Sequence, residues 1–488
     1  MIALKSSHVA AALAVFAACV AARIDMAAAE DHIEPGLQGQ STAGEGRVLS
    51  RPYSKAINLV GHDPIYGRDS NVQLAWVDHC AYVSSTAGPF PLIGVTKGDT
   101  ALTGVAVIDV SDPRNPKAVM LLRDRGSAAA LEAMHAVAAP DRKVLVAGAY
   151  HGGQNAAGTS GTGHDPKATP AWLNVYDVSD CAHPKLMAEV EWPENSHSLR
   201  LSPDGRLVYG TNLSPFTGKG GIQVMDISDL AKPRFLGKFG ATRTDGTTFE
   251  FASHEVSFSP DGMRMYAGVN SSMGGDLNKD IKIFPPNREA LGPNGGGVYI
   301  FDNSDFAERR PDPKLRLLGT VPGGGWHSVM PARIGGVPYL VGGAELGACP
   351  GTWPKITNIS DERKPFIAGE FKLAMNRPEN CPPLPGSGKG GISGIIPTPG
   401  TAALHYNDVD SATETRLGLF QFLWGGLRIV DLKNPANPVE VAYFKPGDAC
   451  GGHVRYVRET GHIWLSCGQS GFYVIELTPD LRASMKPN

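Results

Sequence analysis

Several short motifs that identify common enzyme classes are missing from this sequence. It contains no Gly-x-x-x-x-Gly-Lys phosphate-binding loop, no Gly-x-Ser-x-Gly nucleophile elbow and no His-Glu-x-x-His zinc motif. Its seven cysteines include no Cys-x-x-Cys pair, the usual spacing in cysteine-based zinc sites. We therefore expect none of the chemistry that these motifs support.

Charge of one sign and long apolar runs are also scarce. The formal net charge is -3, and no stretch gathers basic residues, so we expect neither nucleic acid nor an anionic membrane surface as a partner. One apolar run, Val9 to Ala22, follows Lys5 and precedes three alanines at 27–29, which is the pattern of a cleaved signal peptide. The run is too short to span a membrane. We expect a signal peptide over residues 1–29, a periplasmic or secreted product and no integral membrane association.

The sequence contains a long repeat instead. Its inner half is typified by residues 196–212, which begin Ser-His and turn at Ser-Pro-Asp-Gly, and its outer half by residues 221–239, where Asp-Ile-Ser-Asp is followed by Pro. Alternating apolar residues predict strands, and the Asp, Ser, Pro and Gly clusters predict tight turns. Seven such units recur at about 45–60 residues, the size of a four-stranded propeller blade.

The repeat predicts an all-β fold, a seven-bladed β-propeller. The last unit ends after its third strand, and residues 55–62 have the pattern of an outer strand, so we expect this N-terminal strand to close the ring. The predicted segments are a signal peptide (1–29), a flexible lead-in (30–53), the propeller (54–480) and a tail (481–488). The carboxylates at the outer turns are expected to be structural caps: Asp109, Asp177, Asp226, Asp302 and Asp431.

Two segments of the repeat, Val-Ile-Asp-Val-Ser-Asp-Pro at 107–113 and Leu-Arg-Ile-Val-Asp-Leu at 427–432, resemble the family of exported bacterial proteins with LVIVD repeats. Over residues 55–478 this resemblance implies a β-propeller and little about a reaction. The chain is more distantly similar to the selenium-binding protein and methanethiol oxidase propellers, which use a metal. The cysteine motif of those propellers is not matched here.

Histidine opens the first strand in six of the seven units, and the first unit has Asn71 there. Because the first strand of a blade lines the central channel, we expect these imidazoles to form a ring at the channel mouth. The six residues are His135, His197, His254, His327, His405 and His453.

Two interpretations of the histidines remain open. Each histidine can belong to a hydrogen-bond network that fastens its own blade, as in WD-repeat propellers. Alternatively, three or four neighbours bind a transition metal, either copper, iron or zinc, through neutral nitrogen atoms. Among the six, we expect the neighbours His197, His254 and His327 to share the ion.

Other residues near these histidines are candidates for a site. Acid–base groups are Glu255, Glu345 and Asp408. Residues placed to line a pocket are Asn71, Tyr150, His151, Trp326 and Trp424. The metal hypothesis predicts an exported enzyme that oxidises, cleaves or hydrolyses a small organic molecule. The structural hypothesis predicts a propeller without catalytic activity that docks a protein or a glycan. The oligomeric state does not follow from the sequence.

Six cysteines follow residue 29, and an even number in an exported chain favours disulfides. The expected order of strands places them in three neighbouring pairs: Cys80 with Cys181, Cys349 with Cys381, and Cys450 with Cys467.

Overall fold

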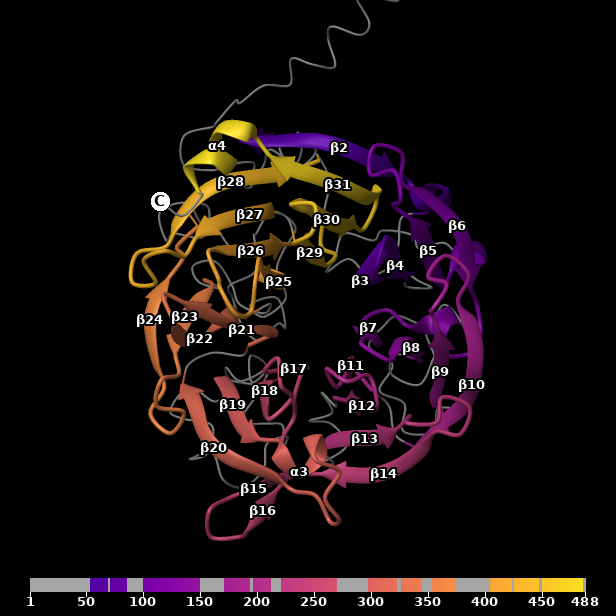
Figure 1. Ribbon diagram of the computed structural model, residues 1–488, viewed down its shortest axis with the longest axis vertical. Helices are drawn as coiled ribbons and strands as arrows, with labels where there is room; N and C mark the ends of the chain where they lie inside the picture. Colours follow the sequence, from indigo (N-terminus) through magenta and orange to yellow (C-terminus); the bar gives the residue numbers. More distant parts are fainter. Residues whose placement is uncertain are drawn as a thin grey trace, which may run out of the picture.

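The computed structural model arranges seven β-sheets around a central axis, as the blades of a propeller (Figure 1). It describes residues 53–68, 71–85, 100–149, 171–193, 196–211, 221–269, 297–322, 326–344, 353–373, 404–423, 425–446 and 450–485. The predicted all-β, seven-bladed fold is confirmed. The predicted signal peptide lies outside the described residues, and none of the helices described is long and apolar enough to cross a membrane.

Within each blade the strands are antiparallel and run outwards from the channel in chain order. Blade 1 holds β3 (Asn71–Val77), β4 (Cys80–Ser85), β5 (Val105–Asp109) and β6 (Lys117–Leu122). Blade 2 holds β7 (Met134–Ala139), β8 (Arg142–Gly148), β9 (Ala171–Asp177) and β10 (Lys185–Trp192). Blade 3 holds β11 (Leu199–Leu201), β12 (Leu207–Gly210), β13 (Ile222–Asp226) and β14 (Arg234–Phe239).

Blade 4 holds β17 (Glu255–Phe258), β18 (Arg264–Val269), β19 (Gly297–Asp302) and β20 (Leu315–Pro322). Its edge is extended by β15 (Ala241–Thr242), which is parallel to β20, and by β16 (Thr248–Phe249). Blade 5 holds β21 (Ser328–Ile334), β22 (Val337–Gly343), β23 (Lys355–Asn358) and β24 (Phe366–Glu370). Blade 6 holds β25 (Leu404–Val409), β26 (Leu417–Phe422), β27 (Gly426–Asp431) and β28 (Val439–Lys445).

Blade 7 combines the two ends of the described chain. Its inner strands are β29 (Val454–Val457), β30 (His462–Cys467) and β31 (Gly471–Leu477), and its outer strand is β2 (Ile57–Asp63), antiparallel to β31. The predicted closure by an N-terminal strand is therefore confirmed. The sequence did not predict that β1 (Tyr53–Lys55) would add a fifth strand to blade 6 by pairing with β28.

The turns between the third and fourth strands are held as the sequence predicted. The Asp109 carboxylate accepts a hydrogen bond from the Ser111 N–H at 2.8 Å, and the Asp226 carboxylate accepts one from the Ser228 N–H at 2.9 Å. Equivalent bonds reach Asp177, Asp302 and Asp431. These carboxylates satisfy backbone donors that would otherwise lack partners at the turn.

The core of the protein lies between neighbouring blades. Alternate side chains of each strand face opposite neighbours, so Leu199 and Leu201 pack towards blade 2, whereas Leu207 and Tyr209 pack towards blade 4. Each inner strand is consequently buried on both faces. The polar side chains of the inner strands therefore gather beside the channel, and this geometry places the candidate site.

The outer strand of every blade contains a β-bulge at the same place. In each case one residue of the outer strand has no partner in the third strand, as between Leu59 and Gly61 in β2 or between Ile367 and Gly369 in β24. The other five bulges interrupt β6, β10, β14, β20 and β28. A bulge twists an exposed edge and so protects it against pairing with another chain.

Three of these bulges are followed by a glycine that touches the next blade. A Cβ atom on Gly61, Gly319 or Gly369 would overlap the carbonyl oxygen of Pro113, Glu362 or Pro435, respectively. Each of these carbonyls belongs to the turn between the third and fourth strands of the following blade. The bulge and the capped turn therefore fit together as a contact between blades, and only glycine allows it at these three positions.

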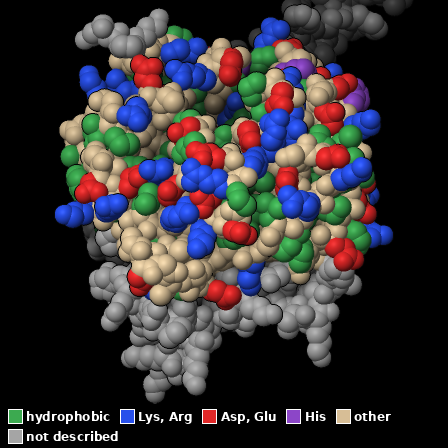
Figure 2. All heavy atoms as spheres, turned by 60° about the horizontal axis from the view of Figure 1, so that its bottom comes forward, with side chains coloured by type: hydrophobic (Ala, Val, Ile, Leu, Met, Phe, Trp, Pro, Cys, Tyr) green, Lys and Arg blue, Asp and Glu red, His purple; other side chains and the backbone are tan. Residues whose placement is uncertain are grey.

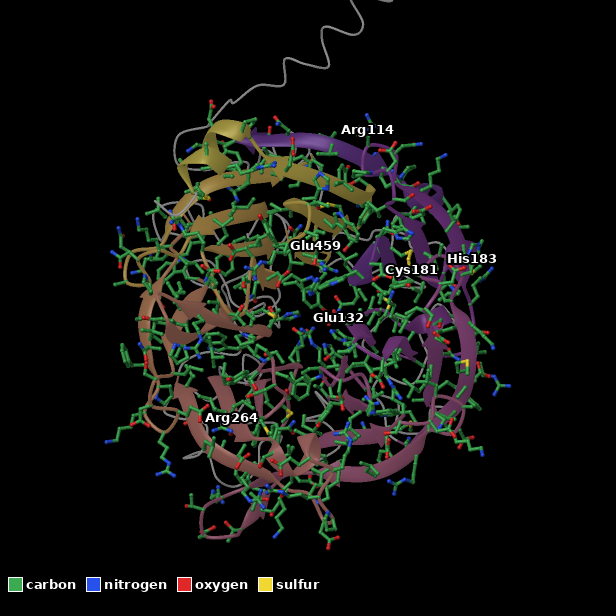
Figure 3. The ribbon with its side chains drawn as sticks, in the orientation of Figure 1. Arg114, Glu132, Cys181, His183, Arg264 and Glu459 are labelled. Carbon is green, nitrogen blue, oxygen red and sulfur yellow. A yellow bond between two sulfur atoms is a disulfide. The ribbon has the colours of Figure 1, made fainter. Side chains whose placement is uncertain are left out.

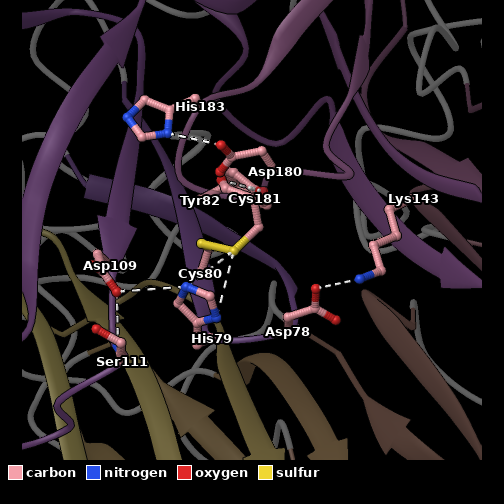
Figure 4. The surroundings of a disulfide bond; sticks show 10 residues. All are labelled: Asp78, His79, Cys80, Tyr82, Asp109, Ser111, Lys143, Asp180, Cys181 and His183. Atoms are coloured by element: carbon pink, nitrogen blue, oxygen red, sulfur yellow. Dashed lines mark hydrogen bonds and ion pairs between the residues drawn. A yellow bond between two sulfur atoms is a disulfide. The ribbon is translucent and has the colours of Figure 1, made fainter.

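Two disulfides connect parts of the ring. Cys80 pairs with Cys181 across blades 1 and 2, with Cα atoms 5.7 Å apart (Figure 4). Cys450 pairs with Cys467 within blade 7. Both pairs match the prediction, whereas Cys349 and Cys381 lie outside the described residues.

The outer surface carries charges of both signs. Figure 2 shows Lys and Arg side chains interspersed with Asp and Glu on the face that it presents. Charged side chains also pair between neighbouring loops, as Arg206 does with Asp141 at 2.5 Å and Arg309 with Asp204 at 2.7 Å. No single sign of charge dominates this face.

The contact between blades predicts an effect of Gly369→Ala. The added methyl group must displace the Pro435 carbonyl, and overpacking of this kind costs about 3 kcal/mol at the upper end of its usual range. Urea unfolding followed by circular dichroism should show this loss. Ala188 occupies the equivalent position in blade 2 and already carries a methyl group, so Ala188→Gly should change stability by no more than about 1 kcal/mol. An unchanged midpoint for Gly369→Ala would refute the role of this contact.

Candidate functional site

Five of the six predicted histidines gather where the inner strands begin. His197, His254, His327 and His453 lie one or two residues before β11, β17, β21 and β29, and His405 is the second residue of β25. All five are buried, with exposed fractions of 0 to 4%. The common starting point of the inner strands therefore brings these imidazoles together, as the repeat predicted.

The rings follow one another in the order of the blades. Ring centroids are 4.1 Å apart for His197 and His254, 3.6 Å for His254 and His327, and 4.7 Å for His327 and His405. Tyr406 continues the series, with its centroid 4.5 Å from those of His405 and His453. Imidazoles from blades 3 to 7 thus form an arc around the channel.

Glu132 lies inside this arc, and the sequence analysis missed it. Its Oε2 atom is 3.1 Å from His197 Nε2 and 3.6 Å from His254 Nε2, and its Oε1 atom is 3.6 Å from His405 Nε2. Figure 3 shows it on the inner side of blade 2, facing the channel. One carboxylate that approaches imidazoles from blades 3, 4 and 6 must lie close to the axis.

Glu132 takes the place in blade 2 that His197 takes in blade 3. The Gly148 N–H bonds to the carbonyl of Ala133, which follows Glu132, and the Thr211 N–H bonds to the carbonyl of Ser198, which follows His197. Each of the two residues also lies two positions before its strand. The signal that would have found Glu132 is this position relative to the strand, because its residue type differs from that of the repeat.

His135 lies apart from the arc, inside strand β7. Its Nδ1 atom accepts a hydrogen bond from the Leu201 N–H of the neighbouring inner strand at 3.3 Å. Burial and the nearby charge of Arg200 hold its pKa well below the usual value. The structure thus gives His135 a contact between blades 2 and 3.

His405 reaches the arc because of a bulge. The pairing of β25 with β26 shifts between Leu404 and Tyr406, which places His405 at a bulge in the ladder. Bulges of this kind re-aim side chains next to functional sites. The Nδ1 atom of His405 donates to the Gly451 carbonyl, which turns Nε2 towards Glu132 and fixes the tautomer in the way usual for metal-binding histidines.

The protonation states suit metal binding. Burial lowers the pKa of His327 well below its usual value, and the neighbouring His254 and His405 lower it further. Burial and Arg200 lower the pKa of His453 to about 3. Burial raises the pKa of Glu132, but its imidazole neighbours outweigh this effect and hold it well below the ordinary value. An ionised carboxylate together with imidazoles, of which burial keeps His327 and His453 neutral, is a set of donors that a divalent metal prefers.

Three of these residues meet the distance condition for one ion. Donor atoms of Glu132, His254 and His327 all lie within 4.8 Å of one another. His197 and His405 approach the same carboxylate and are positioned to add a fourth ligand.

A second group of possible donors, His79 with Cys80 and Cys181, also lies close together. The Nε2 atom of His79 is 3.6 Å from Cys181 Sγ and 3.8 Å from Asp109 Oδ1 (Figure 4). The two sulfur atoms form a disulfide, and a metal binds cysteine as the thiolate. In this state the group supports the fold rather than a metal.

Two predicted acid–base residues, Glu255 and Asp408, lie further along the inner strands than the histidines of the arc. Glu255 Oε1 is 3.1 Å from Arg200 Nη1, and burial raises the Glu255 pKa to about 7 although Arg200 opposes the rise. Asp408 accepts hydrogen bonds from the N–H groups of Tyr456 and Val409, and burial raises its pKa to about 6.

The remaining predicted residues are not brought to the arc. Asn71 is fully buried and accepts a hydrogen bond from Arg68 Nε at 2.7 Å, while Arg68 also binds four backbone carbonyls of blade 1. Trp326 is fully buried in the core between blades 4 and 5. Glu345, Tyr150, His151 and Trp424 lie outside the described residues.

Comparison with known families gives one match. Residues 422–445, which include the whole of β27 and β28, match the model of the LVIVD repeat. The protein is a β-propeller that carries the LVIVD repeat. The matched segment belongs to the outer half of blade 6, so it bears on the scaffold of this LVIVD-repeat propeller and not on its channel.

The other comparisons leave the function open. No curated protein matches the chain in sequence. A chain in the crystal structure of the mitotic checkpoint complex is similar in fold, with a TM-score of 0.45, 10% identity, and coverage of 87% of this chain and 94% of that chain. Identity this low carries no information about function.

The buried carboxyl of Glu255 predicts a dependence of stability on pH. Its pKa rises from 4.5 to about 7 on folding, so its protonation favours the folded state. This contribution is complete below about pH 4.5 and is lost as the pH rises through about 7. Arg200, Glu132, His405 and Asp408 act on the same carboxyl.

The measurement compares the wild type with Glu255→Gln in urea unfolding of metal-free protein across this range. The wild type should lose up to roughly 3 kcal/mol relative to the variant between about pH 4.5 and about pH 8. Glu414, whose side chain is 82% exposed, supplies the control Glu414→Gln, which should show no such trend. A difference between wild type and Glu255→Gln that stays constant with pH would contradict the shift.

Proposed function

We propose that this propeller is a metal-dependent enzyme that transforms a small organic molecule in its central channel. The observation that supports this most is the convergence of donor atoms from Glu132, His254 and His327 within 4.8 Å. Buried carboxylates and imidazoles are costly to assemble without a compensating ligand, because each loses its hydration. A bound cation would offset that cost.

The donor set narrows the choice among copper, iron and zinc. Two imidazoles and one carboxylate are the ligands of non-haem iron(II) oxygenases and of catalytic zinc sites that keep an open position. Copper sites of the electron-transfer type require a cysteine thiolate, and the described cysteines near the channel, Cys450 and Cys467, form a disulfide. We therefore favour iron or zinc over a copper site of the electron-transfer type.

A metal ion at this position would supply Lewis-acid activation of a substrate oxygen, of water or of dioxygen. The protein supplies the rest. Glu132 carries the charge that retains the cation, and the bond from His405 to Gly451 orients one imidazole. Glu255, with a pKa of about 7, can give or accept a proton near neutral pH, which a general acid–base group requires. The residues around the proposed metal ion thus suit an oxidation as well as a hydrolysis or an elimination.

We also infer that the protein works outside the cytoplasm. The two disulfides support this, because such bonds persist in the periplasm and the extracellular space. The expected signal peptide would direct it there.

Metal analysis of the purified protein tests the proposal. Inductively coupled plasma mass spectrometry should find about one iron or zinc ion per chain. The variants Glu132→Gln and His327→Gln should bind it at least about tenfold more weakly, since each removes one ligand. His183 has a side chain that is 72% exposed and pairs only with Asp180 among the residues described, so His183→Gln serves as the control.

The alternative is a structural role for the histidines. In that case the protein would hold no stoichiometric metal, and the substitutions would lower its unfolding temperature without changing its metal content. That outcome would favour a binding or scaffold propeller.

A further inference from the structure

Arg200 is the middle residue of β11, the inner strand of blade 3. It pairs with Glu255 of blade 4 at 3.1 Å. Its charge also acts on titratable groups of three other blades: His135 in blade 2, Asp408 in blade 6 and His453 in blade 7. These three residues lie in the inner strands β7 and β25 or directly before β29, so we infer that Arg200 faces the channel that the inner strands enclose. Its side chain is 14% exposed, so it is accessible from the channel.

Arg455 supplies a second cation on the opposite side. Its guanidinium carbon lies 3.9 Å from the centre of the Trp76 ring and 5.8 Å from that of Trp464. Among the described residues, its Nε and Nη1 atoms have no hydrogen-bond partner although both are buried. Burial lowers its pKa to about 9, against the opposing charges of Asp408 and Glu459. Buried guanidinium donors without partners are costly, and an anion is the natural acceptor.

The nearby carboxylates do not fill this need. Asp408 directs its two oxygens to backbone N–H groups of Tyr456 and Val409. Burial raises the pKa of Asp408 to about 6, so a proton neutralises part of this carboxylate near physiological pH. Protonation of Asp408 removes a negative charge that faces Arg455, and the channel then attracts an anion.

The formal charges support the same conclusion. The charged groups around this part of the channel are Glu132, Glu255, Asp408, Arg200 and Arg455, with Glu459 in the exposed turn below. The first five sum to one negative charge when all are ionised. A divalent cation beside Glu132 makes the sum positive, and protonation of Asp408 alone brings it to zero.

We propose that Arg200 and Arg455 form a carboxylate-binding subsite below the arc of histidines, so that the substrate is a small organic acid. Arg200 follows His197 by three residues, and Arg455 follows His453 by two. At about 3.3 Å per residue, the subsite lies about 7–10 Å along the channel from the imidazoles. An acid of that length can place its carboxylate between the arginines and its reactive end beside Glu132. This inference rests on the proposed function only for the identity of the reactive end.

The test uses the purified full-length protein and simple acids as probes. Isothermal titration calorimetry measures the binding of acetate, benzoate and indole-3-acetate, each against its uncharged amide. At least one acid should bind about tenfold or more tightly than its amide, because a charge-assisted hydrogen bond to arginine is lost in the amide. Binding should be tighter at about pH 5.5 than at about pH 8, and titration in two buffers of different ionisation heat should show proton uptake at neutral pH.

Variants identify the residues. Arg455→Gln and Arg200→Gln should each weaken binding of the acid at least about tenfold, while Arg200→Lys keeps the charge and retains part of the affinity. Arg114, with a side chain that is 81% exposed (Figure 3), supplies the control Arg114→Gln. Circular dichroism reports whether each variant is folded.

The proposal is overturned if no acid binds more tightly than its amide, or if both folded glutamine variants keep the affinity of the wild type. If the variants do not fold, the comparison of acids with amides in the wild type decides. Metal content is measured on the same samples. If the protein prefers acids but holds no metal, the subsite stands and the metal-dependent function is refuted. If it holds a metal but shows no preference for acids, the subsite is refuted and the metal-dependent function stands.

Discussion

The antiparallel ladder between β2 and β31 is the interaction on which the geometry of this protein depends. It joins the N-terminal strand to the last blade and so closes a ring of seven sheets. Closure fixes the radius of the channel, and the radius fixes how near side chains from opposite blades can come. Glu132 from blade 2 reaches His405 of blade 6 only because the ring is closed at this size. The site is therefore a property of the whole ring and belongs to no single blade.

The blades are alike on the outside and different on the inside. Every outer strand has the same bulge, and the turns before these strands are fastened by the same kind of capping bond. Glycine after the bulge lets a neighbouring turn approach, so the repeated residues of the outer half hold one blade against the next. The inner strands are free of this constraint. They keep histidine at the channel in five blades, but blade 2 places Glu132 there and blade 1 places Asn71 in a network with Arg68.

This division explains what the sequence could predict. Strands, capped turns and blade number depend on local patterns, so the fold and its closure followed from the sequence. Two of the disulfides followed from blade order for the same reason. The edge strands β1 and β15 did not, because their pairing depends on what lies beside them after folding. Five histidines of the arc were predictable because their type repeats.

Glu132 could not be found in this way because it repeats nothing. Its position corresponds to that of His197 only when positions are counted from the start of the strand. Counting back from the hairpin turn fails, since β7 has six residues and β11 has three. The same difference in strand length explains why His135, which the repeat predicts at the start of the inner strand of blade 2, lies within β7 and contacts Leu201 instead. The surroundings of Glu132 are formed by residues of five blades that meet only in the folded ring. The local sequence around Glu132 does not contain that information.

Electrostatics then distinguishes two groups of charged residues that lie at different depths along the channel. The imidazoles around Glu132 hold its pKa well below the ordinary value, so the proposed metal would lie beside a negative charge that the protein keeps in place. Further along the channel, Arg200 and Arg455 lie beside carboxylates whose pKa values burial raises, and the proposed subsite for an anion rests on these two arginines. A cation site and an anion site a few residues apart along the channel would orient a molecule with one acidic end. The two sites would also stabilise each other, because their charges are opposite.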